Sequence, residues 1–139
     1  LINNHGTLMS NIDDALGSFY DATVDLGIAD CVPTFTISDF ARTLTSNGNG
    51  TDHAWGGNTI VMGGAVKGNE IYGKYPDLSL GSNLDLGKGV LIPTTSADEY
   101  FAELALWFGV SPNDLHLILP NLSNFYSYDP SNAPLQFLL

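Results

Sequence analysis

Four polar side chains that could bind a metal or an anion lie close together along the chain: Asp39, Arg42, Asp52 and His53. They fall in a long Gly/Asn-rich connection, and long connections without structure of their own are uncommon and are often functional. Asp39 follows a short apolar stretch, Thr34–Ile37. Because open α/β sheets bind ligands beside the carboxyl ends of their strands, the sequence predicts a binding site at this point.

Each of these residues also has an ordinary structural interpretation. Asp39 is a candidate metal ligand, a general base or a helix N-cap. Arg42, the only arginine, could clamp an anion with its planar guanidinium or form a surface salt bridge. Asp52 could be a second ligand or a partner that orients the neighbouring imidazole.

Two histidines, His5 and His53, stand in Gly-rich polar stretches where turns are expected, and loops of that kind commonly carry function. Taken singly, each is more typical of an exposed surface histidine. The sequence has no phosphate-loop or dinucleotide-binding motif, and Ser38 lacks the G-x-S-x-G context of a nucleophile elbow. The candidate chemistry is therefore metal or anion binding and not attack by a serine.

Composition narrows the class of protein. The 139-residue chain has a formal net charge of −11, and so acidic a surface repels phosphate backbones, so we expect no nucleic-acid binding. Its one cysteine, Cys31, excludes an internal disulfide and a cysteine-based zinc cluster, and its position predicts a small buried side chain. No signal peptide and no apolar run of roughly 20 residues is found, so no transmembrane segment is expected. Because the chain begins with Leu1 and not Met, we expect a processed or excised piece of a longer protein.

The first half of the chain has the pattern of an α/β protein. Apolar residues at spacings of three and four predict an amphipathic helix over Thr7–Leu26, which Gly27 ends. Thr34–Ile37 and Thr59–Met62 are predicted to be short buried strands. The order of helix, short loop and apolar strand favours a parallel sheet.

Glycine-rich segments separate the remaining elements. Asp39–Gly57 is predicted to be a long loop in which Asn47–Gly50 makes a tight turn with positive φ. Ala65–Tyr72 has the pattern of a hairpin, and Gly73–Gly89 that of a loop.

The clearest helix begins at a capping box formed by Ser96 and Glu99 and ends at Gly109. The apolar tail Leu135–Leu139 should pack on the chain's own core or on another chain. We expect the helix to bury a broad aromatic face in the core, made of Tyr100, Phe101, Leu104, Trp107 and Phe108.

Four stretches of this sequence have a familiar pattern: ISDFARTLTSNGNGTDHAWGG, VMGGAVKGNEIYGKYPDL, LIPTTSADEYFAELALWFGVS and LPNLSNF. Together they resemble a large family of uncharacterised bacterial proteins, typically exported by the twin-arginine (Tat) route. That family is similar in fold to the alkaline phosphatase and sulfatase superfamily. The likeness spans nearly the whole chain.

The resemblance implies a site for a divalent metal such as zinc, manganese or calcium. His5 would be one ligand in a His-Gly turn before the first helix, Asp39 the ligand at the strand end, and His53 the ligand on the later loop. Two positions depart from the pattern. Asn3, a poorer ligand, replaces the usual Asp, and Phe40 stands where phosphatases have a histidine.

The resemblance further implies that residues 1–139 form the C-terminal portion of a larger domain, a partial alkaline-phosphatase/sulfatase-like sheet flanked by helices. The superfamily's nucleophile would lie in the missing N-terminal portion. We therefore predict a non-catalytic or degenerate module of an exported protein, periplasmic or extracellular, that associates with copies of itself or with the missing portion, because half a sheet leaves a strand edge to cover. The alternative is part of a metal-dependent hydrolase of phosphate or sulfate esters.

Overall fold

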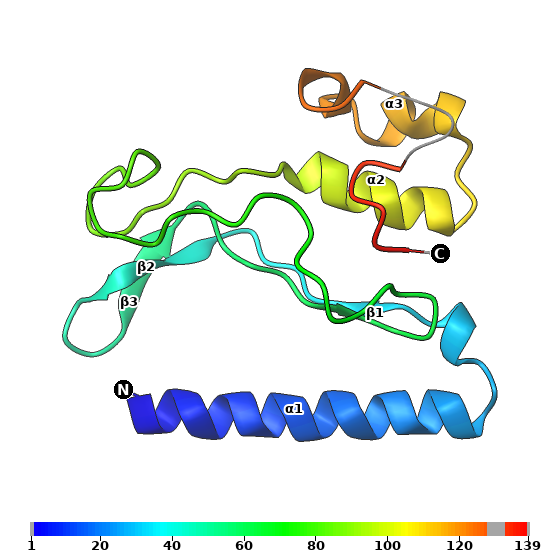
Figure 1. The fold of residues 1–139 in the computed structure, drawn as a ribbon, viewed down its shortest axis with the longest axis horizontal. Coiled ribbons are helices and arrows are strands. Elements are labelled where there is room, and N and C mark those ends of the chain that lie inside the picture. The colour runs from blue at the N-terminus through cyan, green and yellow to red at the C-terminus, as the bar shows by residue number, and fades with distance from the viewer. Residues whose placement is uncertain (1, 128–132, 139) are drawn as a thin grey trace.

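The computed structural model describes residues 2–127 and 133–138. This part of the chain is a mixed α/β structure with three α-helices and two small antiparallel sheets, each of two strands (Figure 1). The elements in chain order are α1 (Ile2–Asp25), η1 (Ala29–Cys31), β1 (Thr34–Phe35), β2 (Ala41–Ser46), β3 (Thr51–Ala54), β4 (Val61–Met62), α2 (Ala97–Trp107), η2 (Pro112–Asp114), α3 (Leu115–Ile118) and η3 (Leu122–Asn124), where η denotes a 3₁₀ turn.

The first helix is longer than predicted. α1 begins at Ile2, so His5 and Gly6 lie within it, and the expected His-Gly turn before a helix is wrong. The reason is that the spacing of three and four continues upstream of Thr7, through His5 to Ile2. The end of the helix is as predicted, since Gly27 has a φ of 68° and its N–H donates to the Val24 carbonyl at 2.9 Å.

The two predicted strands pair with each other, but they run antiparallel and not parallel. β1 and β4 are antiparallel, with Thr34 opposite Met62, and Thr36 extends the pairing by donating its N–H to the Ile60 carbonyl at 2.9 Å. The predicted parallel sheet is therefore wrong. A parallel pair needs a crossover connection that places both strands in the same direction, whereas the chain here returns directly from a hairpin.

That hairpin occupies the predicted long loop. β2 and β3 are antiparallel, with Ala41 opposite Ala54, and the Asn47–Gly50 segment turns the chain, with Gly48 at a φ of 103°. The turn was predicted correctly and its flanking strands were not, because their alternation of small polar and apolar residues is weak. The loop at Gly89 covers the outer edge of β2, where the Leu44 N–H donates to the Gly89 carbonyl at 3.2 Å.

Two glycine-rich segments follow. The predicted hairpin at Ala65–Tyr72 is wrong, because Val66 instead pairs with Leu138 from the C-terminal tail. The Gly73–Gly89 segment is the predicted loop. Asp85 organises it by accepting N–H donors from three of its glycines, and those hydrogen bonds, Gly81's first, hold the pKa of the Asp85 carboxyl below its usual value.

α2 lies at the centre of the buried core. Its capping box is present as predicted, since the Ser96 side chain accepts from the Glu99 N–H and the Glu99 carboxylate accepts from the Ser96 N–H. One face of α2 packs through Tyr100 with Ala65, just after β4, and with the C-terminal tail. The opposite face packs through Ala102 with α3 and η3. The expected aromatic face is only partly right: Tyr100 is buried, whereas Phe108 is 83% exposed.

The C-terminal tail docks on the chain's own core. Phe137 and Leu138 are buried beside Tyr100, and Leu139 lies outside the described residues. The carboxylate of Glu103, itself only 2% exposed, accepts backbone N–H donors from Leu135, Gln136 and Leu138 at 2.9 to 3.2 Å. The acidic side chain on α2 thus fixes the tail by replacing the water that these amides would otherwise bind.

Candidate functional site

Three of the side chains singled out in the sequence lie together on one face of the β2–β3 hairpin. Arg42 and His53 are directly opposite each other in the strand pairing. The ring of Phe40 packs on the His53 imidazole, with 4.2 Å between centroids, and the Arg42 guanidinium carbon lies 5.0 Å from the centre of the Phe40 ring. Arg42 also donates to the Thr51 carbonyl at 3.1 Å. These contacts join the two strands, so Arg42 and His53 already have structural roles.

Asp52 is directed away from this stack. Consecutive residues of a strand point to opposite faces, so Asp52 and His53 do not share one. The Asp52 carboxylate accepts from the Asn47 side-chain amide at 2.7 Å, and its N–H donates to the Thr43 hydroxyl at 3.1 Å. In this structure Asp52 therefore stabilises the turn of the hairpin.

The other predicted site residues come from separate elements. Asn3 and His5 lie exposed in the first turns of α1, and Asp39 lies exposed in the bend before β2. Within residues 2–127 and 133–138, no three His, Cys, Asp or Glu side chains are grouped so that they could hold a metal ion. The structure thus brings together Arg42 and His53 and leaves the predicted ligand set of His5, Asp39 and His53 a prediction.

α1 carries a second candidate site that the sequence did not single out. A stripe of mainly apolar side chains runs along it, and at its middle Ile12 and Phe19 remain 44% and 47% exposed. Only Leu16 is half-buried and Thr23 buried. We call this stripe the α1 seam; it consists of Ile2, His5, Met9, Ile12, Leu16, Phe19 and Thr23.

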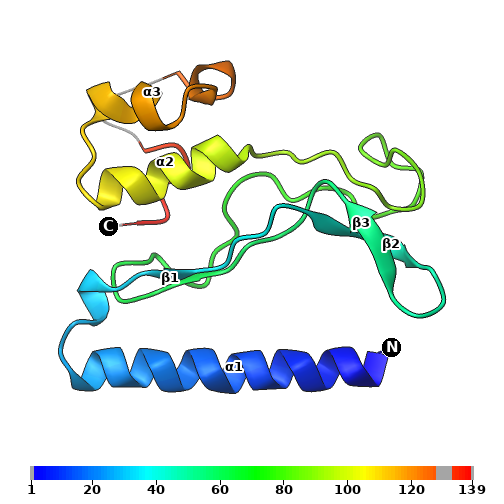
Figure 2. The same ribbon diagram turned by 180° about the vertical axis from the view of Figure 1, so that it is seen from behind.

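The body of the protein leaves most of the α1 seam uncovered. Neither cluster of buried residues found in the described chain includes an α1 side chain, and the main contact of α1 is with η1, just beyond its C-terminal end. Figures 1 and 2 show α1 from both sides as a separate layer, joined to the rest through this end. An apolar face of this extent is characteristic of an interaction surface.

The sequence of α1 does little to stabilise the helix by itself. It contains no Lys or Arg that could pair with its aspartates, and it contains Gly6 and Gly17, each of which costs about 0.8–1 kcal/mol relative to alanine. Asp21 and Asp25 lie near its C-terminal end, where the helix dipole disfavours negative charge. Most helix stability in proteins comes from packing an amphipathic face, and neither buried cluster of the described residues includes an α1 side chain.

The exposed surface of the whole chain is also large for its mass. A compact monomer of 14.8 kDa exposes about 7,000 Å², whereas this chain exposes 9,436 Å². The excess is therefore about 2,400 Å² for one chain.

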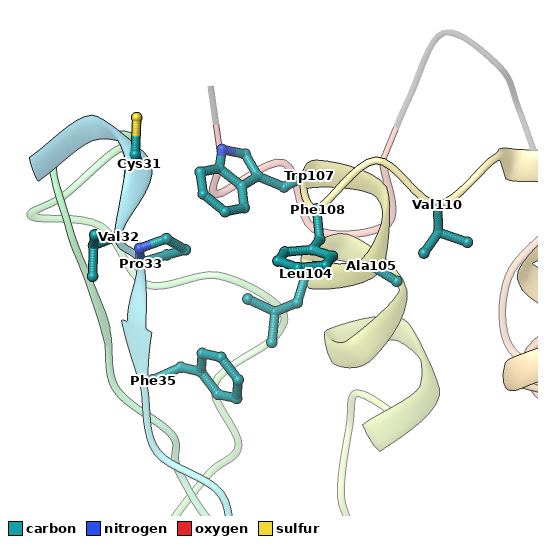
Figure 3. Close-up of a pocket in the computed structure, with 9 residues that line it drawn as sticks. All are labelled: Cys31, Val32, Pro33, Phe35, Leu104, Ala105, Trp107, Phe108 and Val110. Atoms are coloured by element: carbon teal, nitrogen blue, oxygen red, sulfur yellow. The ribbon is translucent and has the colours of Figure 1, made fainter. Parts of the chain in front are cut away.

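A second apolar surface lies between η1, β1 and α2. It is a cleft of about 530 Å³ whose walls are nearly all apolar. Figure 3 shows Pro33 and Phe35 on one wall and Leu104 and Phe108 on the other. Cys31 lines the same cleft and is exposed, which corrects the predicted buried position, because η1 turns it outward. The lining contains no charged side chain.

Two features of the structure, the burial of Glu103 and the exposure of α1, were not predicted from the sequence. Glu103 interrupts the apolar face of α2, three residues after Tyr100 and four before Trp107, and a lone carboxylate there indicates a buried acceptor. No comparable residue indicates that α1 is exposed, because an amphipathic pattern identifies the apolar face of a helix but not what covers it.

Comparison with known proteins gives one match. A model of the family described as "Protein of unknown function (DUF1501)" matches residues 1–119. Neither the curated proteins nor the solved structures include a match to this chain. In the described residues, no helix combines the length and the apolar character needed to cross a membrane.

Proposed function

The chain belongs to the DUF1501 family of proteins of unknown function, and from that premise we propose that it is a non-catalytic, assembly-forming part of an exported protein. Its role is to associate through the α1 seam and to complete a larger folded unit by doing so. Export and a relation to the alkaline phosphatase and sulfatase superfamily belong to the proposal, and the sequence resemblance supports them.

The exposure of the α1 seam carries this proposal. Full burial of a large apolar side chain contributes about 1.5–3 kcal/mol, and Met9, Ile12 and Phe19 each retain more than 40% of their exposure. Covering them would therefore contribute about 1 kcal/mol each. A partner would supply the stabilisation that the sequence of α1 lacks.

The residues near the hairpin favour a non-catalytic role. Asn3 and Phe40 replace groups that a metal site of the related superfamily would use, and the imidazole of His53 packs on the Phe40 ring. One N–H of the Arg42 guanidinium donates to the Thr51 carbonyl. Phe40, Arg42 and His53 thus support the hairpin, and a reaction would need a nucleophile from elsewhere.

Sedimentation velocity at 5–100 µM combined with hydrogen exchange tests the proposal. We expect a particle heavier than 14.8 kDa with α1 protected from exchange, or a monomer in which α1 exchanges freely until its partner is added. A monomer at 100 µM whose α1 amides are as well protected as those of α2 would overturn the proposal, because the helix would then need no partner.

A second candidate function is part of a metal-dependent hydrolase of phosphate or sulfate esters. The observation in its favour is that Arg42, which could clamp an anion, and His53, a potential ligand, share one exposed face of the hairpin. Elemental analysis of purified protein separates the two functions. Stoichiometric zinc, manganese or calcium that is lost on His53→Ala would support the hydrolase, whereas metal-free protein without aryl phosphatase or aryl sulfatase activity is expected here.

A further inference from the structure

We propose that the partner of the α1 seam is the α1 seam of a second copy of this chain, packed antiparallel to the first. This inference rests on the proposed function and specifies the partner. It starts from the spacing along the seam, which alternates three and four residues without a break from Ile2 to Thr23. That alternation is the heptad pattern of helices that pair side by side.

The seam is complementary to itself in one antiparallel register. If Met9 of one copy lies opposite Phe19 of the other, then Ile12 lies opposite Leu16, and the two-fold axis passes close to residue 14. Met–Phe contacts are favourable because the thioether packs well on an aromatic ring. The four central layers, Met9–Phe19 and Ile12–Leu16 each taken twice, contain only large apolar side chains.

The same register places the two polar positions of the seam together. His5 falls opposite Thr23 of the other copy, at the ends of the paired segment. Thr23 is already buried and donates its hydroxyl to the Tyr20 carbonyl at 2.7 Å. The open part of the seam therefore runs from His5 to Phe19, and His5 lies beside the C-terminal end of the opposite helix.

Charge is arranged to permit pairing between identical acidic chains. Asp14, Asp21 and Asp25 project from the side of α1 opposite the seam, and only Asp13 borders it. A basic partner would gain little from aspartates that face away from the interface. Antiparallel packing also places the positive end of each helix dipole beside the negative end of the other, whereas parallel packing places like ends side by side.

The area is sufficient for a specific dimer. With the flanking Leu8, Ala15 and Tyr20, the open seam would bury on the order of 1,000 Å² over both copies, which reaches the lower limit for a specific interface. The remaining excess surface of each copy includes the apolar cleft beside α2. We therefore expect a dimer that dissociates reversibly in the micromolar range.

Cysteine crosslinking in a Cys31→Ser background tests the register. Chains carrying Met9→Cys are mixed with chains carrying Phe19→Cys and oxidised or treated with a short thiol crosslinker. We expect a mixed dimer between the two variants and little crosslinking within either one. The matched control is Thr7→Cys with Asp21→Cys, which have the same sum of residue numbers but lie on the opposite side of the helix, and they should not crosslink.

Sedimentation of two charge variants tests whether the dimer forms through the α1 seam. Ile12→Asp places a charge in the seam and should weaken dimerisation at least tenfold. Val24→Asp adds the same charge outside the seam, at a similarly exposed position, and should weaken it less than threefold. Dimerisation of the unmodified chain should strengthen from 50 to 500 mM NaCl, because salt screens the repulsion between the two Asp13 carboxylates.

The contrary outcomes separate this inference from the proposed function. Crosslinking within Met9→Cys alone would mean a parallel pair, and a dimer unaffected by Ile12→Asp would mean another surface. Either result overturns the antiparallel seam and leaves assembly intact. A monomer at 100 µM with α1 exchanging freely also overturns self-pairing and leaves a different partner. A monomer with α1 protected overturns both.

Discussion

The two long helices of this protein have similar patterns and opposite surroundings. α1 and α2 are both amphipathic, but α2 is enclosed on two faces, whereas α1 makes its main contact with the 3₁₀ turn that follows it. α2 has a complete capping box, and α1 has no acidic residue in its first turn and no basic residue in its last. An apolar stripe alone therefore does not define a core helix. Local stabilisation and a partner surface within the chain distinguish α2 from α1.

The largest effect is expected for removal of an α2 side chain at the centre of the core. Tyr100→Ala should lower the free energy of unfolding by about 3–5 kcal/mol, because the ring packs against Phe35, Phe101 and Phe137. Urea denaturation measures this loss. The exposed aromatic of α1 provides the contrast: Phe19→Ala should change the stability of the monomer by less than about 1 kcal/mol. Equal losses would mean that α1 is covered as α2 is.

Removal of the buried carboxylate should have the next largest effect. Glu103→Ala removes the acceptor that three tail amides share and should cost about 2–4 kcal/mol. Hydrogen exchange should then accelerate at Leu135, Gln136 and Leu138 before it does in α2. Glu103→Gln keeps one acceptor oxygen and should lose less. Unchanged exchange in the tail of Glu103→Ala would contradict the role assigned to this residue.

Alkaline pH offers a further test of α2. Burial raises the pKa of the Tyr100 phenol above its usual value of 10.0, so the folded state retains this proton more tightly than the unfolded state does. The stability contributed by the neutral phenol is therefore complete below pH 10 and is lost as the pH rises through the folded pKa. Denaturation midpoints measured between pH 8 and pH 11 should fall less steeply for Tyr100→Phe. Parallel curves for the two proteins would contradict this prediction.

Glycine substitutions give the smallest expected effect and differ in sign between the helices. Gly17 is in the interior of α1 with nothing within 4 Å of an added Cβ, so Gly17→Ala should raise helix stability by about 1 kcal/mol. Gly109 ends α2 at a φ of 99°, so Gly109→Ala should lower stability by about 1 kcal/mol, through strain at a positive φ. Circular dichroism during urea titration measures both. A stabilising Gly109→Ala would show that the end of α2 can relax.

Much of the local structure could be read from short stretches of sequence. The capping box at Ser96 and Glu99, the helix ends at Gly27 and Gly109 and the turn at Asn47–Gly50 all appear as predicted. Each depends on the conformational preferences of a few neighbouring residues, so the signal and the structure occupy the same positions. The amphipathic character of α1 was evident for the same reason.

What the sequence determined by itself was therefore the identity of the helices, their ends and the apolar face that each presents, since these follow from side-chain spacing and local hydrogen bonding. The tertiary structure decided the antiparallel pairing of β1 with β4 and the burial of Glu103 under the tail. It also decided that α1 would lie largely uncovered, because burial depends on which distant segments meet.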